Sequence, residues 1–170
     1  MSPIVKRTWA KVGQTPRISH KTRSPSKITA IGAIAVRYTG RGARTMFRLL
    51  KARNANSAVF VQFLTQLLQN IRGKIIVIWD RLVAHRSRLV NRWLAQNKRI
   101  TTEFFPPYAP ELNPVEYLWS YLKMNGLSNL AATDLEHLYR ETKSSLCSIR
   151  KNRNLSRSFI DHSQARFFKQ

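Results

Sequence analysis

The chain has 170 residues, enough for one domain with its own hydrophobic core. Hydrophobic residues make up 43% of it, which excludes a wholly disordered protein. Its 30 Lys and Arg residues far outnumber its 8 Asp and Glu residues, so the formal net charge is +22. Such a charge is typical of nucleic-acid-binding proteins, because neutralised phosphates release their condensed counterions. A ribosome-associated protein, or one that binds an anionic membrane surface, is the alternative.

The sequence lacks the disulfides, signal peptide and membrane span of a secreted or membrane protein. Cys147 is the single cysteine, so neither an internal disulfide nor a thiolate-rich zinc site can form. Residues 1–7 lack the apolar stretch of a signal peptide. The longest apolar runs, such as residues 75–79, are far too short to span a bilayer. We therefore expect a cytoplasmic, nucleoid-associated protein with no membrane partner.

The charges are distributed unevenly along the chain. All 8 acidic residues lie at or after position 80, and the first 79 residues hold 15 Lys or Arg residues. No side chain before Asp80 can therefore act as a carboxylate ligand. Residues 1–27 are predicted to be a basic, turn-rich arm, followed by a core over residues 28–150 and a basic tail over residues 151–170.

A hairpin and a helix are the first elements predicted. Residues 28–36 are apolar and rich in β-branched side chains, which predicts a buried strand. A turn at residues 39–42 leads to a second strand over residues 44–50, which can pair with the first. From Asn56, apolar residues recur at intervals of three and four, which predicts an amphipathic helix ending near Gly73.

The next elements alternate between strands and helices. Residues 74–79 are predicted to form a short apolar strand that is closed by Asp80. A second helix is predicted over residues 86–97, and a strand over residues 100–105 ends where two prolines follow. Pro114 suits the first turn of a third helix, because that position needs no amide hydrogen.

Two further helices are expected near the end of the chain. Thr133 and Glu136 resemble a capping box that opens a helix running to about Ile149. One more short helix is expected around residues 159–168. The order of all these elements predicts a single α/β domain with a mixed sheet flanked by helices.

Two acidic residues occupy positions where a carboxylate could bind a metal ion in an active site. Asp80 follows an apolar strand, where open α/β sheets commonly place active sites, although an Asp at a strand end also commonly caps a turn. Glu116 lies in the first turn of the predicted third helix, where the helix dipole alone would favour a carboxylate. Carboxylates of this kind could hold a hard cation such as Mg²⁺. Glu111 is close by in the loop and is more simply interpreted as solvated or paired with an Arg.

Neighbouring side chains allow two interpretations each. His85 could contact a metal-bound substrate or order the loop after Asp80, and the second role is preferred. Asn113 could donate to a phosphate, or could be an ordinary turn residue before a proline. Trp119 could stack on an unpaired base, although its helical spacing favours a place in the core.

A dense basic stretch coincides with the predicted hairpin. If its two strands pair, the arginines are expected to line one end of the hairpin and to contact phosphates without reading bases. The basic tail is either a second phosphate-contact patch or simply solvated. The candidate DNA-binding residues of the hairpin are Arg37, Arg41, Arg44, Arg48, Lys51 and Arg53.

Two segments make the sequence familiar. Residues 75–85 (IIVIWDRLVAH) and 104–123 (FFPPYAPELNPVEYLWSYLK) resemble the catalytic core of bacterial insertion-sequence transposases of the mariner-related DDE group. Upstream, residues 7–18 (RTWAKVGQTPRI) resemble the Trp and Gly-x-x-Pro element of the same family. The resemblance extends over residues 7–122 and implies a ribonuclease-H-like fold.

The family uses three carboxylates to hold two divalent ions, Mg²⁺ or Mn²⁺, for DNA strand cleavage and strand transfer. By resemblance, Asp80 is the second of these carboxylates and Glu116 the third, with 35 residues between them. The first carboxylate of the family lies on the first strand, ahead of the Trp element, where this sequence has no acid. The resemblance thus implies a partial catalytic core without its first strand.

The sequence supports one main hypothesis of function and two alternatives. The main one is a transposase catalytic domain for DNA transposition, as a fragment that lacks the first catalytic Asp. Its expected partners are transposon-end and target DNA, an upstream-encoded transposase segment and a second copy of the chain. The first alternative is a non-enzymatic, basic DNA-binding remnant. The second, a ribosome-associated RNA-binding protein, is ranked last.

Overall fold

An antiparallel hairpin lies at the centre of the fold in this computed structural model, which describes residues 11–13, 27–40 and 42–164. Strands β1 (Ile28–Val36) and β2 (Ala43–Lys51) pair along their whole length. The turn between them bends at Gly40, whose φ of 72° lies in the left-handed region that glycine adopts without strain. The predicted hairpin is confirmed. Most of the expected arm, residues 1–10 and 14–26, lies outside the described residues.

A second pair of strands is parallel. Strand β3 (Ile75–Trp79) pairs with β4 (Ile100–Phe104), and the crossover between them contains a short 3₁₀ turn and helix α2 (Arg88–Gln96). The α/β class with both parallel and antiparallel pairing is therefore confirmed. Over residues 27–40 and 42–164, however, the strands form two separate two-stranded sheets instead of one continuous sheet.

Helix α1 (Ser57–Asn70) joins both sheets in one hydrophobic cluster. Its buried face carries Phe60, Phe63, Leu64 and Leu67, as the three-and-four spacing predicted. These side chains pack together with residues of the hairpin, of β3, of β4 and of α2. The helix begins at Asn56, whose side chain accepts a hydrogen bond from the Val59 amide (3.1 Å).

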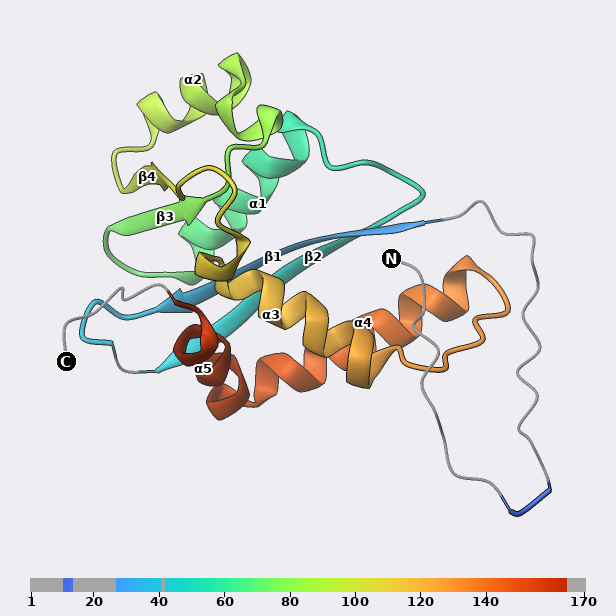
Figure 1. The fold of residues 1–170 in the computed structure, drawn as a ribbon. Coiled ribbons are helices and arrows are strands. Elements are labelled where there is room, and N and C mark those ends of the chain that lie inside the picture. The colour runs from blue at the N-terminus through green and yellow to red at the C-terminus, as the bar shows by residue number, and fades with distance from the viewer. Residues whose placement is uncertain (1–10, 14–26, 41, 165–170) are drawn as a thin grey trace.

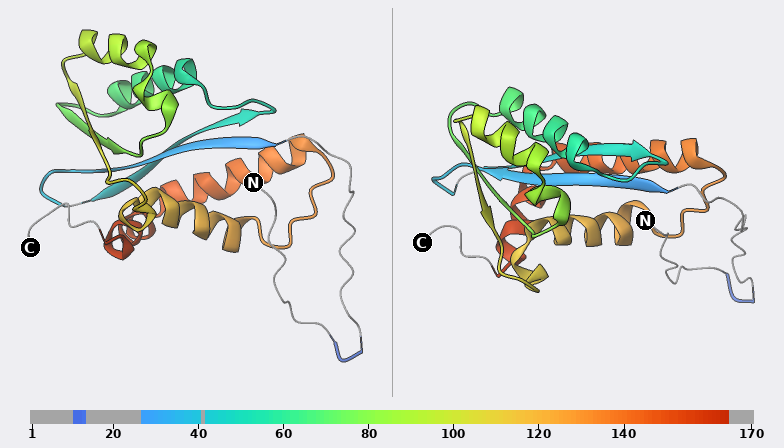
Figure 2. Two further views of the ribbon diagram at one scale, coloured as in Figure 1. Left: turned by 45° about the horizontal axis from the view of Figure 1, so that its top comes forward. Right: turned by 90° about the horizontal axis from the view of Figure 1, so that it is seen from above.

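The opposite face of the hairpin is covered by α3 (Pro114–Tyr121), α4 (Leu135–Lys151) and α5 (Arg153–His162). Figures 1 and 2 show these helices on one side of the hairpin and α1 and α2 on the other. The alternation of β2 explains this arrangement, because Met46 belongs to the α1 cluster and Phe47 packs on the other side. The second cluster includes Leu118, Leu122, Leu127, Leu146, Ile149 and Phe159.

The C-terminal helices differ in detail from the sequence predictions. Asp134, and not Thr133, caps α4: its carboxylate accepts a hydrogen bond from the His137 amide (2.7 Å). Glu136 forms an ion pair with Lys51 (2.6 Å) instead of completing a capping box, so the predicted box is wrong. Two further elements reach beyond their expected bounds: α4 runs to Lys151, and α5 begins well before position 159.

Part of the expected basic tail packs against the hairpin. Helix α5 buries Phe159 and Ile160, and its buried Ser156 lies 2.8 Å from Thr45 of β2, oxygen to oxygen. Residues 165–168 of the expected terminal helix lie outside the described residues. Among the helices that the structure describes, none is both long and apolar enough to cross a membrane.

Candidate active site

Asp80 lies directly after β3, at the carboxyl end of the parallel pair. Its side chain is 61% exposed, and Oδ1 accepts a hydrogen bond from the amide of Leu82 (3.1 Å). This Asx-type turn directs the chain away from the strand, which was the structural interpretation of the residue. The carboxylate still faces solvent, and its second oxygen has no hydrogen bond among the described residues. A further ligand can therefore reach it.

His85 is held against Asp80 by polar contacts at Nδ1 and by two aromatic rings. Nδ1 lies 3.0 Å from Oδ1 and 3.1 Å from the carbonyl oxygen of Asp80. Because a carbonyl oxygen only accepts, Nδ1 carries the proton and donates. The ring stacks on Trp79 at 4.3 Å and meets the edge of Phe60, and the residue is only 7% exposed. This geometry orders the loop after Asp80.

Glu116 projects from the first turn of α3, as predicted. Asn113 is the N-cap of this helix, since its side chain accepts a hydrogen bond from the Val115 amide (3.1 Å). Pro114 takes the first helical position, where its missing amide hydrogen is not needed. The cap fixes the direction of the helix and hence the position of Glu116, which is exposed. Asn113 therefore has a clear structural role.

Asp80 and Glu116 line the same cleft, although 35 residues separate them in the sequence. The cleft has a volume of about 410 Å³ and lies between the end of β3 and the loop that precedes α3. Arg81 also lines it and would attract an anionic ligand. In the part of the chain that the structure describes, no three His, Cys, Asp or Glu side chains come together to hold a metal ion.

Tyr108 is a cleft residue that the sequence reasoning did not single out. It is fully exposed, and its φ of 56° places a non-glycine residue in the left-handed region. The signal was present, because Pro106, Pro107 and Pro110 surround this tyrosine and restrict its loop. A ring held out in this manner suits stacking on an unpaired base.

The candidate DNA-binding residues of the hairpin do not all gather at one end. Arg37 and Arg44 flank the turn, whereas Lys51 and Arg53 lie at the opposite end, nine strand residues or roughly 30 Å away. Lys51 is engaged with Glu136, and its ammonium group lies 4.4 Å from the centre of the Tyr139 ring.

The prediction that the arginines line one end of the hairpin is therefore wrong, because they are distributed along the whole length of the two strands. Arg48 lies within β2 and donates to the side chain of Gln62 (2.7 Å). Arg41 lies outside the described residues. Trp119 is half-buried and packs in the second hydrophobic cluster, as its spacing predicted, so it is not free to stack on a base.

Comparison of sequences places these features among known proteins. The profile of the family described as "DDE superfamily endonuclease" matches residues 2–139. The "Insertion element IS630 uncharacterized 39 kDa protein" of Shigella sonnei is 27% identical over 124 residues, which are 72% of this chain and 34% of that protein. The "Uncharacterized protein y4pE/y4sA" of Sinorhizobium fredii (strain NBRC 101917 / NGR234) is 46% identical over 39 residues, 23% of this chain and 29% of that protein. The chain thus spans about a third of the curated relatives it matches.

Solved structures show the same fold. The Mos1 mariner paired end complex with Mn has a TM-score of 0.65 at 19% identity, over 95% of this chain and 48% of that chain. The Mos1 transposase paired-end complex with left transposon end has a TM-score of 0.62 at 20% identity, over 97% and 49%. The catalytic domain of Mos1 mariner transposase has a TM-score of 0.54 at 16% identity, over 79% and 74%. The expected ribonuclease-H-like α/β fold is therefore confirmed.

Proposed function

Because this chain belongs to the DDE superfamily endonuclease family, as the motifs around Asp80 and Glu116 predicted, we propose that it is part of the catalytic domain of an insertion-sequence transposase. Its function in this proposal is DNA transposition, by metal-dependent strand cleavage and strand transfer. The observation that carries the proposal is the convergence of Asp80 and Glu116 in one open cleft at the end of a parallel strand.

The two carboxylates fit a hard divalent cation. Both are exposed, both reach one cleft, and such oxygen ligands suit Mg²⁺ or Mn²⁺, which keep several waters and take substrate phosphate oxygens. Asp80 and Glu116 would hold the ion, and the family site holds two. A bound divalent ion activates an attacking hydroxyl and stabilises the leaving oxygen of a phosphodiester. His85 and Asn113 then act as positioning residues, one for each carboxylate.

A third carboxylate would have to come from another segment. The chain has no acid before Asp80, and over residues 27–40 and 42–164 both β1 and β3 pair on one edge only. Strand β3 also exposes Ile76 (69%) and Ile78 (39%), which is unusual for an apolar strand. We propose that an apolar, Asp-bearing strand of an upstream-encoded transposase segment pairs with the free edge of β3. It would place its carboxylate beside Asp80.

DNA is the proposed partner of the complete site. The net charge of +22 supports this, and two of the similar solved structures are paired-end complexes of Mos1, one of them with a transposon end. Arg37 and Arg44 at the hairpin turn, Arg48 in the strand and Arg53 beyond it are candidates for phosphate contact. A homodimer is a further proposal, which sedimentation with and without DNA would test.

The second candidate function is a DNA-binding remnant that does not cleave. One observation favours it: the described residues bring only two acidic side chains to the cleft. This candidate shares the positive charge with the first and differs from it at the metal site. Metal binding is therefore the property that separates the two.

The test is calorimetric titration of the full chain with Mn²⁺. Asp80→Asn and Glu116→Gln are each expected to abolish most of the binding heat. The matched control is Glu111→Gln, because Glu111 is exposed and adjacent but does not line the cleft. Equal binding by all four proteins would overturn the site assignment. Plasmid nicking that appears only when the proposed strand is added as a peptide would favour the enzyme over the remnant.

A further inference from the structure

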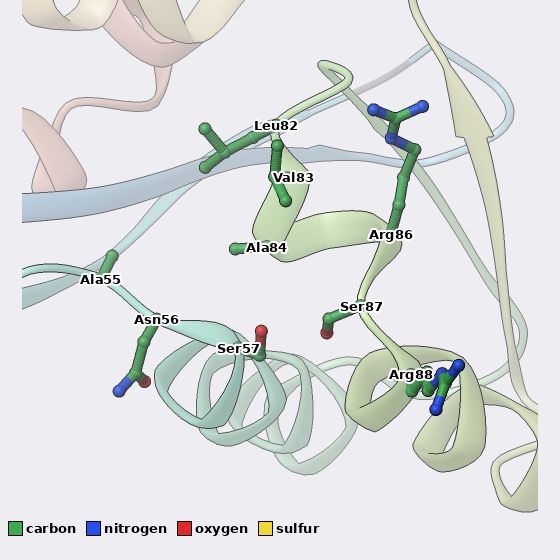
Figure 3. A pocket seen from close by; sticks show the side chains of 9 residues that line it. All are labelled: Ala55, Asn56, Ser57, Leu82, Val83, Ala84, Arg86, Ser87 and Arg88. Carbon is green, nitrogen blue, oxygen red and sulfur yellow. The ribbon is translucent and has the colours of Figure 1, made fainter.

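A second cleft lies beside the candidate active site, between the first turns of α1 and α2. It has a volume of about 850 Å³ and is lined by Asn56, Ser57, the short 3₁₀ turn Val83–Arg86 and Arg88. Figure 3 shows Arg86 and Arg88 leaving the chain on either side of Ser87. Leu82, which also lines this cleft, is only two residues beyond Asp80. The segment after Asp80 therefore connects the two clefts.

The positive charge around this cleft is not neutralised within the protein. Arg86, Arg88 and Arg92 are exposed, and no carboxylate in the described part of the chain, which contains all 8 acids, forms an ion pair with any of them. From position 81 to position 102 the sequence has six Lys or Arg residues and no acid. Arg86 and Arg88 thus place positive charge without an acidic partner at the lining of the cleft.

The arrangement of these arginines is unfavourable for the helix itself. Arg88 and Arg92 are four residues apart, so that two like charges lie on one face of α2. Arg88 also lies in the first turn, where the helix dipole disfavours positive charge, and this helix has no acidic residue in its first turn. Folding alone does not account for this pattern, but an anionic partner would relieve the repulsion.

An apolar strip accompanies the arginines. Val83 is 77% exposed and Leu82 is 47% exposed, and both line the cleft. Cationic groups beside small apolar side chains match a sugar–phosphate backbone, in which charged phosphates alternate with less polar sugars.

We propose that this cleft binds the backbone of the same DNA that reaches Asp80, with Arg86 and Arg88 on phosphates and Val83 against a sugar. The inference rests on the proposed function for the identity of the ligand. It adds a contact surface, the α1–α2 cleft, which lies outside the carboxylate site and outside the hairpin residues. One DNA strand would pass from the Asp80 cleft along Arg81 and Leu82 into the second cleft.

The test measures binding of a short DNA duplex to the full chain by fluorescence anisotropy at several salt concentrations. Each phosphate contact contributes about 0.9 to the slope of log K against log salt concentration. The double variant Arg86→Gln/Arg88→Gln is therefore expected to lower the slope by about 2. The charge-retaining Arg86→Lys/Arg88→Lys should keep the slope, which separates charge from loss of fold.

The matched control is Arg140→Gln/Lys143→Gln, which removes the same charge from the exposed surface of α4. An equal decrease of slope in both Gln variants, or no decrease in the cleft variant, overturns the inference. Mn²⁺ titration of the wild-type chain reports the carboxylate site independently of this slope, so failure of the metal-site proposal is detected separately. A wild-type chain that binds an acidic Glu-rich peptide in the cleft more tightly than DNA would also overturn it.

Discussion

The close approach of β1 to α3 at Gly32 leads to a sharp prediction for Gly32→Ala. A Cβ at this position would lie 2.7 Å from Cζ2 and 2.8 Å from Cη2 of the Trp119 indole. Carbon atoms in a protein core pack at about 3.5–4.0 Å. Either the indole or the helix that carries it must therefore move by about 1 Å, and Trp119 is one turn from Glu116 on the same helix.

The size of the effect follows from two opposing contributions. Overpacking of a core by one methyl group costs about 1–3 kcal/mol, and a rigid indole between two layers argues for the upper value. Replacing a glycine within a strand recovers about 0.5–1 kcal/mol of backbone entropy. The net loss in the free energy of unfolding is about 2 kcal/mol. For a chain of 170 residues this corresponds to about 4–8 °C in Tm.

The measurement is a double-mutant cycle by urea unfolding, with Gly32→Ala, Trp119→Phe and the double variant. Phenylalanine lacks the outer indole carbons, so Gly32→Ala should cost less than half as much in that background. Mn²⁺ binding would report whether movement of α3 displaces Glu116. The reasoning is refuted if Gly32→Ala is as stable as the wild type, or if its cost is the same in both backgrounds.

Three further predictions concern stability. Thr45→Val leaves the buried Ser156 hydroxyl without its partner and should cost about 1–3 kcal/mol in urea unfolding, much of which Ser156→Ala should restore in the double variant. Ala52→Gly relieves a left-handed φ of 48° and should raise the free energy of unfolding by about 0.5–1 kcal/mol. The hydrogen bond from the His137 amide holds the pKa of Asp134 below its ordinary value of 3.8. The ionised cap should therefore stabilise α4 above pH 3.8, and this stabilisation should be lost as the pH falls through the lowered pKa. Asp134→Asn should remove this pH dependence, which acid unfolding would measure.

Each of these predictions has a result that contradicts it. Equal costs of Thr45→Val with and without Ser156→Ala would show that the hydroxyl pair is not the cause. Ala33→Gly, in the middle of β1, is the control for Ala52→Gly and should lower the free energy of unfolding. An increase in the free energy of unfolding for both variants would argue against relief of strain at Ala52. Identical acid unfolding of the wild type and Asp134→Asn would show that ionisation of Asp134 does not contribute to the pH dependence of stability.

Local sequence signals predicted most of the elements, because each depends on neighbouring residues alone. The spacing of Phe60, Phe63 and Leu67 defined α1, and Asn113 followed by Pro114 marked the start of α3. The cap of α4 was assigned one residue too early, at Thr133, since a threonine followed by an aspartate offers two capping side chains and only the backbone decides between them.

Long-range arrangements were less accessible from the sequence. The separation of the strands into two pairs depends on hydrogen bonds between distant segments, which no local pattern encodes. The engagement of Lys51 by Glu136, 85 positions away, follows from the packing of α4 on β2. At the candidate site, Asp80 and Glu116 were identified by motif, but the contact that His85 makes with Asp80 was one of two interpretations until its ring was placed.

The two candidate ligands belong to different hydrophobic clusters. Asp80 follows Trp79 of the α1 cluster, and Glu116 precedes Leu118 of the cluster on the other side of the hairpin. The distance between the two carboxylates therefore depends on how the two clusters pack on the hairpin and not on one loop alone. A cation held by both carboxylates would cross-link the two clusters, so the affinity for the cation would depend on how well the interior is packed. Core substitutions far from any ligand atom would then change metal affinity, and the metal would in turn raise the melting temperature of the whole domain.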